Sequence, residues 1–169
     1  MALDPTRIFI HIHPNLEKHP NIQKFAEDFE SYKKQAFDYA KDADCNASEF
    51  LPTLTEEDQQ SFPPDQSLFG RDRLFYKRQA ANDPLYHVHI FKPNDKDCIW
   101  HEEDGVHYSQ WQCTSDAALI YAHMDNDSED FHFLLLEIVD PGAHEKYKED
   151  GAIEYWRKLV VAFRAINKI

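Results

Sequence analysis

The chain contains few glycines and cysteines and has no long hydrophobic run. Its 169 residues include four glycines and neither a GxGxxG nor a P-loop sequence, which excludes the familiar glycine-rich nucleotide-binding loops. No apolar run approaches the roughly 18 residues of a membrane span, and no signal peptide follows Met1. The three cysteines lack a CxxC spacing, which argues against a disulfide framework or a cysteine-based zinc site. These absences favour a protein of the reducing cytoplasm, without a membrane partner.

Positive charge is scarce as well. The chain has 18 Lys+Arg against 31 Asp+Glu, a formal net charge of -13. Because phosphate contacts supply most of the affinity for nucleic acid, this charge disfavours loose binding to naked RNA or DNA. It remains compatible with a partner that presents both RNA and basic protein.

A local basic segment stands against this background, directly after Phe69-Gly70. Its four cations are Arg71, Arg73, Lys77 and Arg78, and its one acid is Asp72. Arginine offers a planar fork of donors that matches a pair of phosphate oxygens, so these residues could bind phosphates. The alternative is a solvated loop whose charges pair with nearby acids.

The hydrophobic pattern predicts one α+β domain over residues 1–169 with a mainly antiparallel sheet. Alternation predicts strands at 7–13, about 85–91, 117–123 and 131–139, the last two forming a hairpin. Apolar steps of three and four predict a helix of about five turns from Asn21 and a closing helix at about 151–167. Residues 41–66 are polar and acidic, and we interpret them as a long connection with a short helix that Thr55 caps.

Histidines are the second group of candidate functional residues. His11 and His13, and likewise His87 and His89, lie two apart on predicted strands, so each pair shares one face. Four imidazoles could bind a metal. The alternative, which we favour, is that alternating polar positions on half-exposed strands simply include histidine. His144, just before the last helix, could be a general acid or base or an exposed loop residue. Arg164 could satisfy the carbonyls at the end of its helix or reach the active face of the sheet, and Tyr121 is a core or rim tyrosine.

Several motifs together resemble the YafO family of bacterial type II toxins. The matching stretches are Phe69-Gly70-Arg71-Asp72, His87-Val88-His89, Thr114-Ser115-Asp116, Leu119-Ile120-Tyr121, Leu134-Leu135-Leu136-Glu137-Ile138, Pro141 with Ala143-His144, and Ala162-Phe163-Arg164. Each motif alone is weakly specific, but their order and spacing together are fairly specific. The resemblance covers roughly residues 67–166 well and the first 40 residues only in layout.

The resemblance implies a RelE-like fold, a small antiparallel sheet packed with an N-terminal and a C-terminal helix. It also implies a ribosome-dependent mRNA interferase that stops translation and is silenced by a cognate antitoxin. The chemistry would be attack of a ribose 2′-hydroxyl on the adjacent phosphate, without a metal or another cofactor.

Residue roles follow from the same resemblance. Arg71 and Arg164 would stabilise the phosphorane, His87 or His89 would act as base, and His144 as acid or substrate ligand. Asp72 would orient Arg71. Substrate-binding support would come from Arg73, Lys77, Arg78 and Tyr121.

Two other functions remain open at this stage. A non-catalytic binder of the ribosome or another basic target is favoured by the charge of -13 and by Cys113, which stands where the family carries a basic residue. A metal-dependent protein could be built on the two His-x-His strands.

Overall fold

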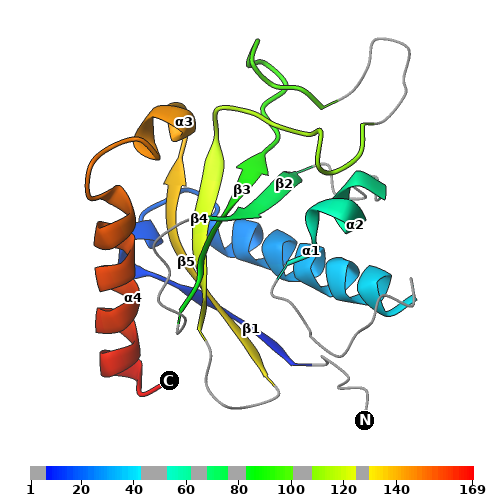
Figure 1. Cartoon of the computed structure of the whole chain (residues 1–169). Helices are drawn as coiled ribbons and strands as arrows, with labels where there is room; N and C mark the ends of the chain where they lie inside the picture. Colours follow the sequence, from blue (N-terminus) through cyan, green and yellow to red (C-terminus); the bar gives the residue numbers. More distant parts are fainter. Residues whose placement is uncertain (1–6, 43–52, 62–67, 76–82, 101–107, 125–129) are drawn as a thin grey trace.

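The computed structural model describes residues 7–42, 53–61, 68–75, 83–100, 108–124 and 130–169. Its strands are β1 (Ile8–Ile12), β2 (Phe69–Leu74), β3 (Leu85–Ile90), β4 (Ala118–Met124) and β5 (Phe131–Val139). Its helices are the 3-10 turn η1 (Pro14–Leu16), α1 (Ile22–Asp42), α2 (Glu56–Ser61), α3 (Ala143–Lys146) and α4 (Ala152–Asn167). Figure 1 shows the sheet with α4 and α1 on opposite sides of it.

The strands form one five-stranded sheet in the order β1-β5-β4-β3-β2. Only β1 and β5 run parallel, and the other pairs are antiparallel. The predicted α+β class with a mainly antiparallel sheet and helices near both ends is therefore confirmed. The strand β2 is a finding that the sequence pattern did not predict, because its alternation is obscured by Gly70 and by charged residues.

The helix α1 covers one face of the sheet. Its side chains Phe29 and Tyr32 pack against Phe69, Tyr121 and their neighbours, forming the larger core. Even-numbered residues of β3 point to this face, so Tyr86 and Val88 belong to the same cluster.

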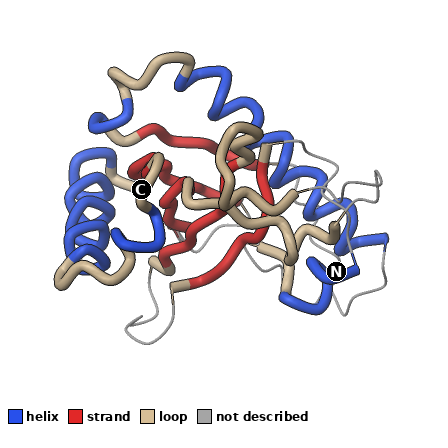
Figure 2. The backbone as a smooth tube through the Cα atoms, turned by 90° about the horizontal axis from the view of Figure 1, so that it is seen from above, coloured by secondary structure: helices blue, strands red, loops and turns tan. Residues whose placement is uncertain are grey.

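The helix α4 covers part of the other face, so that the sheet lies between the two helices (Figure 2). Trp156 is fully buried against Leu134, Leu136 and Phe75, and its indole N–H donates to Glu137 Oε2 at 2.7 Å. Because α4 does not reach over the whole face, the histidines of β3 have space in front of them toward α3.

The outer edge of β2 is covered by two neighbouring segments. The side chain of Gln59 in α2 accepts from the backbone N–H of Asp72 at 2.9 Å and donates to its carbonyl at 2.8 Å. The N–H of Arg71 donates to the carbonyl of Cys113 at 2.9 Å. The predicted cap also exists, since Thr55 Oγ1 accepts from the N–H of Asp58 at 3.2 Å. Residues 53–61 of the predicted connection are thus a packed part of the fold, which protects an edge strand from pairing with another chain.

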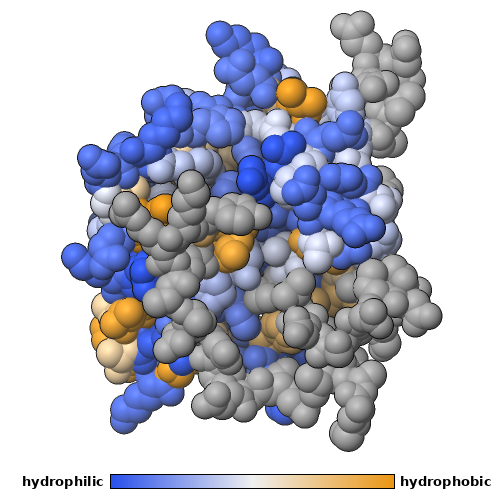
Figure 3. Space-filling view, in the orientation of Figure 1, coloured by the Kyte–Doolittle hydropathy of each residue, from blue (hydrophilic) through white to orange (hydrophobic). Residues whose placement is uncertain are grey.

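The surface seen in Figure 3 is mainly hydrophilic, with an apolar patch over the lower part of α4. Val161 and Ile166 of that helix are 64% and 79% exposed. Among the described residues, no helix is both long and apolar enough to cross a membrane.

Candidate functional site

A pocket of about 370 Å³ opens on the α4 face of β2 and β3, next to α3. It brings together five of the predicted site residues, namely Arg71, Arg73, His87, His89 and His144. Its wall also includes Leu74, Phe75, Thr114 and Tyr147.

Strand pairing explains why cations and imidazoles meet here. Arg73 and His87 are Cα partners in the antiparallel pairing of β2 with β3, so their side chains leave the same face. His89 follows two residues later on that face. Both guanidinium groups lie against the indole of Trp111, with Arg71 Cζ 4.7 Å and Arg73 Cζ 5.4 Å from the ring centroid. Stacking on an aromatic ring holds an arginine fork in place. Arg71 Nε also donates to the carbonyl of Trp111 at 2.5 Å, so the donors of Arg71 that face a ligand are those of its terminal nitrogens.

The imidazole of His89 is oriented from behind by Ser115. Its Nδ1 lies 2.7 Å from the carbonyl oxygen of Ser115 and 3.1 Å from its N–H. The Ser115 hydroxyl donates to the carbonyl of Ile90 at 2.6 Å and so fixes this turn. Burial lowers the pKa of His89 to about 4. The ring is therefore neutral near pH 7, and Nε2 is the nitrogen left for a ligand.

His87 lies next to His89, between Phe75 and Tyr147. Burial, with a smaller contribution from His89, lowers its pKa to about 3. Its Nδ1 is buried and has no hydrogen-bond partner among the described residues, and the same is true of the Tyr147 hydroxyl. Buried polar atoms are nearly always satisfied in folded proteins. These two unpaired atoms in the wall of one pocket indicate a polar ligand or water there.

His144 lies at the mouth of the pocket on α3. Its backbone N–H donates to Asp116 Oδ1 at 3.0 Å, and its Nδ1 is 3.2 Å from the same oxygen. Asp116 also accepts from the N–H of Gly142 at 2.9 Å. These backbone donors, above all that of His144, lower the pKa of Asp116. The ring of His144 is 5.5 Å from that of His89, so the pocket histidines form a continuous row.

The prediction that Asp72 orients Arg71 is contradicted by the structure. Successive residues of a strand point to opposite faces, and Asp72 points into the core under α1. There its Oδ2 accepts from Lys33 Nζ at 2.8 Å, in an ion pair with both side chains 0% exposed. Tyr32, Tyr121 and Thr53 also donate to this carboxylate.

Tyr121 and Arg164 are not brought to the pocket. Tyr121 is fully buried on the α1 face, so it is a core residue and not a substrate ligand. The guanidinium of Arg164 pairs with Asp83 and donates to the carbonyl of Ile169 at 3.1 Å. Asp83 precedes His87 by four residues, roughly 13 Å along an extended chain, so a guanidinium paired with Asp83 lies away from the pocket histidines. Lys77 and Arg78 lie outside the described residues.

The two His-x-His pairs do not converge. They lie on β1 and β3, which β5 and β4 separate in the sheet, a spacing of roughly 14 Å. Across the described parts of the chain, no group of three or more His, Cys, Asp or Glu side chains could hold a metal ion.

Cys113 is not part of the pocket either. Its side chain is fully buried against the carbonyl of Trp100, and burial raises the pKa of its thiol to about 12. Its neighbour Thr114 lines the pocket instead. The carbonyl of Cys113 therefore supports the Arg71 backbone, while its side chain points away from the pocket.

Sequence reasoning missed four functional candidates, Trp111, Ser115, Asp116 and Tyr147. The Thr114-Ser115-Asp116 motif was a signal for two of them, because a polar triplet before an apolar strand places donors and acceptors at a sheet end. Lys33 was also signalled, since it stands between Phe29 and Phe37 at helical spacing on the apolar face of α1. Nothing local in the sequence indicated Tyr147.

Comparisons with known proteins bear on this arrangement. No curated protein and no solved structure matched the chain. One family model did, that of "Toxin YafO, type II toxin-antitoxin system", over residues 31–165. This match spans most of the chain and includes the pocket with its arginines and histidines. The chain therefore belongs to the YafO family of toxins of type II toxin–antitoxin systems.

Proposed function

We propose that this toxin is a ribosome-dependent endoribonuclease that cleaves mRNA in the cytoplasm and so inhibits translation. Its family implies a cognate antitoxin as the partner that restrains it. The single observation that carries the proposal is the pocket in which Arg71 and Arg73 face the histidines of β3 and α3. RNA supplies its own nucleophile, the 2′-hydroxyl, so the protein must supply a base, an acid and cations.

His89 is the residue best suited to act as base. It is neutral because of its lowered pKa of about 4, and Ser115 fixes its ring. A bound phosphate carries negative charge, which favours the imidazolium and raises the basicity of the ring when substrate is present. His87, two residues earlier on the same face of β3, is the alternative base and shares its neutral state.

The remaining roles fall to the rim and to β2. His144 is 54% exposed, and Asp116 holds its Nδ1, which leaves Nε2 to protonate the leaving 5′-oxygen or to bind the substrate. Arg71 and Arg73 would bind the non-bridging oxygens, where charge accumulates in the phosphorane. Lys77 and Arg78, later in the basic segment, would support binding of the RNA backbone.

The test is induction in a bacterial host, followed by mapping of mRNA 5′ ends. Wild-type protein should produce discrete new ends within translated frames and arrest growth. Arg71→Ala and His89→Ala should each lower cleavage by about 100-fold or more, the loss typical when a transition-state contact or catalytic base is removed. Lys158→Ala, a cation removed from the exposed side of α4, is the matched control and should cleave normally.

Other outcomes would decide against the proposal. Full toxicity of both site variants would remove this pocket from the mechanism. Growth arrest without new 5′ ends would show that the protein blocks translation without cutting RNA.

A further inference from the structure

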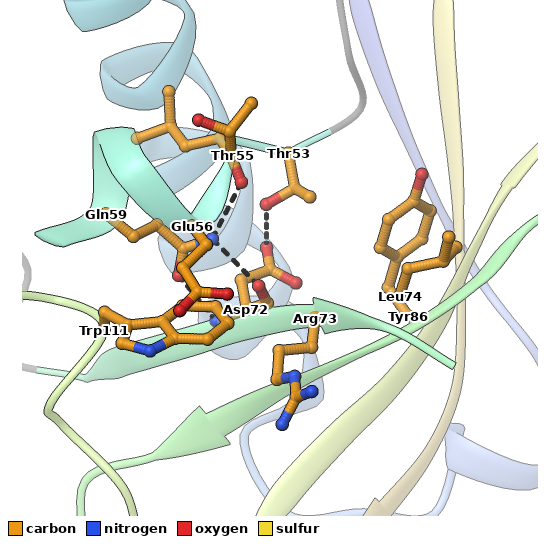
Figure 4. A pocket seen from close by; sticks show the side chains of 10 residues that line it. Thr53, Thr55, Glu56, Gln59, Asp72, Arg73, Leu74, Tyr86 and Trp111 are labelled. Carbon is orange, nitrogen blue, oxygen red and sulfur yellow. Dashed lines mark hydrogen bonds between the residues drawn. The ribbon is translucent and has the colours of Figure 1, made fainter. Parts of the chain in front are cut away.

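A second pocket lies beside the first and has no role in the proposed cleavage step. It encloses about 300 Å³ between α2, β2 and the segment around Trp111. Figure 4 shows Trp111 at one end, Tyr86 and Leu74 at the other, and Glu56 and Thr53 along α2 and the residues before it. We call it the α2 pocket.

The α2 pocket adjoins the pocket of the proposed cleavage site. Arg73 and Leu74 line both cavities. Trp111, which lines the α2 pocket, is the ring on which Arg71 and Arg73 stack. An RNA strand whose phosphate lies between these arginines would therefore carry an adjacent nucleotide to the α2 pocket.

The lining suits a nucleobase. Proteins hold unpaired bases by stacking them on aromatic and apolar side chains and by hydrogen bonds to the base edge. Tyr86 is stacked on Tyr121 at 5.2 Å, so its ring is a rigid wall backed by the core. Leu74 is 37% exposed and closes the same end with an apolar surface.

Glu56 supplies a charged acceptor at the rim of the α2 pocket. It is exposed in the first turn of α2, where it accepts a 3.2 Å hydrogen bond from Gln60. Burial lowers the pKa of Arg71, and the charge of Glu56 opposes that effect, so the carboxylate lies within electrostatic range of the cation that would hold the phosphate. A carboxylate accepts hydrogen bonds only, so it selects base edges that present N–H donors.

We propose that the α2 pocket binds the nucleobase next to the cleaved phosphate and that Glu56 reads its edge. Guanine fits best, because its N1–H and N2–H₂ groups are two adjacent donors for one carboxylate. Uracil, which places carbonyl oxygens on both sides of its single N–H, fits worst. The inference rests on the proposed function, since it assigns a flanking subsite to the same RNA strand.

The experiment is a comparison of cleavage sites between matched variants. Newly formed mRNA 5′ ends are mapped for wild-type protein, Glu56→Gln, Trp111→Leu and Glu57→Gln. Glu57 is the control, because it is exposed in the same turn of α2 and does not line the pocket. Thermal unfolding of each purified variant checks that the fold is retained.

Wild type should favour guanine over uracil at one flanking position. Glu56→Gln should reduce that preference by about tenfold, the discrimination that one good bidentate contact provides. Trp111→Leu should reduce both the preference and the total cleavage, because it also removes the support for Arg71. Glu57→Gln should leave the pattern unchanged.

The two proposals fail in different ways. If wild type forms no new 5′ ends, the endoribonuclease function is wrong, and this subsite falls with it. If wild type cleaves RNA and folded Glu56→Gln keeps the same base preference, the α2 subsite is wrong while the cleavage function stands.

Discussion

Lys33 and Asp72 place an ion pair inside the core, on the opposite face of β2 from Arg71 and Arg73. Burial lowers the pKa of Lys33, and Asp72 offsets part of that effect. The tyrosine hydroxyls around the carboxylate satisfy its remaining lone pairs, and burial raises their pKa values well above the usual range. Such a pair is stable only while both charges and their hydrogen bonds are present.

This arrangement predicts strong coupling between the two residues. Lys33→Met leaves an uncompensated buried carboxylate and should lower the free energy of unfolding by about 3–5 kcal/mol. Asp72→Asn leaves a buried ammonium and should cost a similar amount. The double variant should cost clearly less than the sum, as urea denaturation would measure. Additive costs would mean that the two charges do not depend on each other.

The buried histidines predict a second effect at this scale, a loss of stability in mild acid. The pKa values of His87 and His89, about 3 and about 4, lie below the value of 6.5 for an unfolded histidine. Between pH 6.5 and about 4 the unfolded chain therefore binds protons that the folded chain does not. Each histidine should then lower the free energy of unfolding by about 1.4 kcal/mol per pH unit as the pH falls.

The comparison of wild type with His87→Phe tests this prediction. Phenylalanine can occupy the apolar space between Phe75 and Tyr147 but does not titrate. Urea denaturation at pH 7, 6 and 5 should give a shallower loss for the variant, and the difference should approach about 1.4 kcal/mol per pH unit below pH 6. Parallel curves for the two proteins would show that His87 is not held neutral by the fold.

At the scale of elements, β2 determines where the two arginines of the candidate site lie, because it carries both of them. It is an irregular edge strand, with a register shift between Phe69 and Asp72. Gly70 lies where the backbone passes so close to its neighbours that a Cβ atom would be 2.4 Å from the Cys113 carbonyl and 2.5 Å from the Trp100 ring. The glycine of the Phe-Gly-Arg-Asp motif thus permits a close approach and does not serve a turn.

Gly70→Ala should therefore displace β2 from the loop segment at Cys113. Overpacking of this kind costs about 1–3 kcal/mol, and here the obstructing carbonyl is backbone and cannot rotate away. Because Arg71 is the next residue, cleavage should fall more than the loss of folded protein accounts for. Denaturation and cleavage assays on the same sample would separate the two effects, and full activity with unchanged stability would contradict the close approach.

The sequence predicted the regular elements better than the irregular ones, for a physical reason. Ile8, Ile10 and Ile12 alternate cleanly, and the strand there was predicted within two residues. The Phe-Gly-Arg-Asp motif of β2 shows no alternation of apolar and polar residues, so the strand was not predicted, although its arginines were recognised as candidate site residues. Asp72 was assigned the wrong partner because its true partner, Lys33, is 39 residues away in sequence. Contacts of that range depend on how the helix packs on the sheet, which local pattern does not encode.

At the scale of the whole molecule, a small basic site belongs to a strongly acidic chain. With a net charge of -13, the protein as a whole repels a polyanion, and the Arg71 segment is a local exception. This charge distribution favours an encounter with a basic partner first, and contact with mRNA only where that partner presents it. The dependence on the ribosome that we propose would then follow from long-range electrostatics as well as from contacts at the site.

The charge distribution predicts an unusual salt dependence for binding to naked RNA. Each phosphate contact with a single strand contributes a slope of about -0.7 to the plot of log affinity against log salt. The basic segment offers four cations, so the slope should be no steeper than about -3, and repulsion by the remaining acids should flatten it further.

Anisotropy of a labelled single-stranded RNA, titrated with His89→Ala to prevent cleavage, would measure this slope between low and high salt. Weak binding with a shallow slope is expected, and Arg71→Ala/His89→Ala should flatten the slope by a further ~0.7. A slope much steeper than -3 would require phosphate contacts beyond the basic segment, and the charge distribution would then not explain the ribosome dependence that we propose.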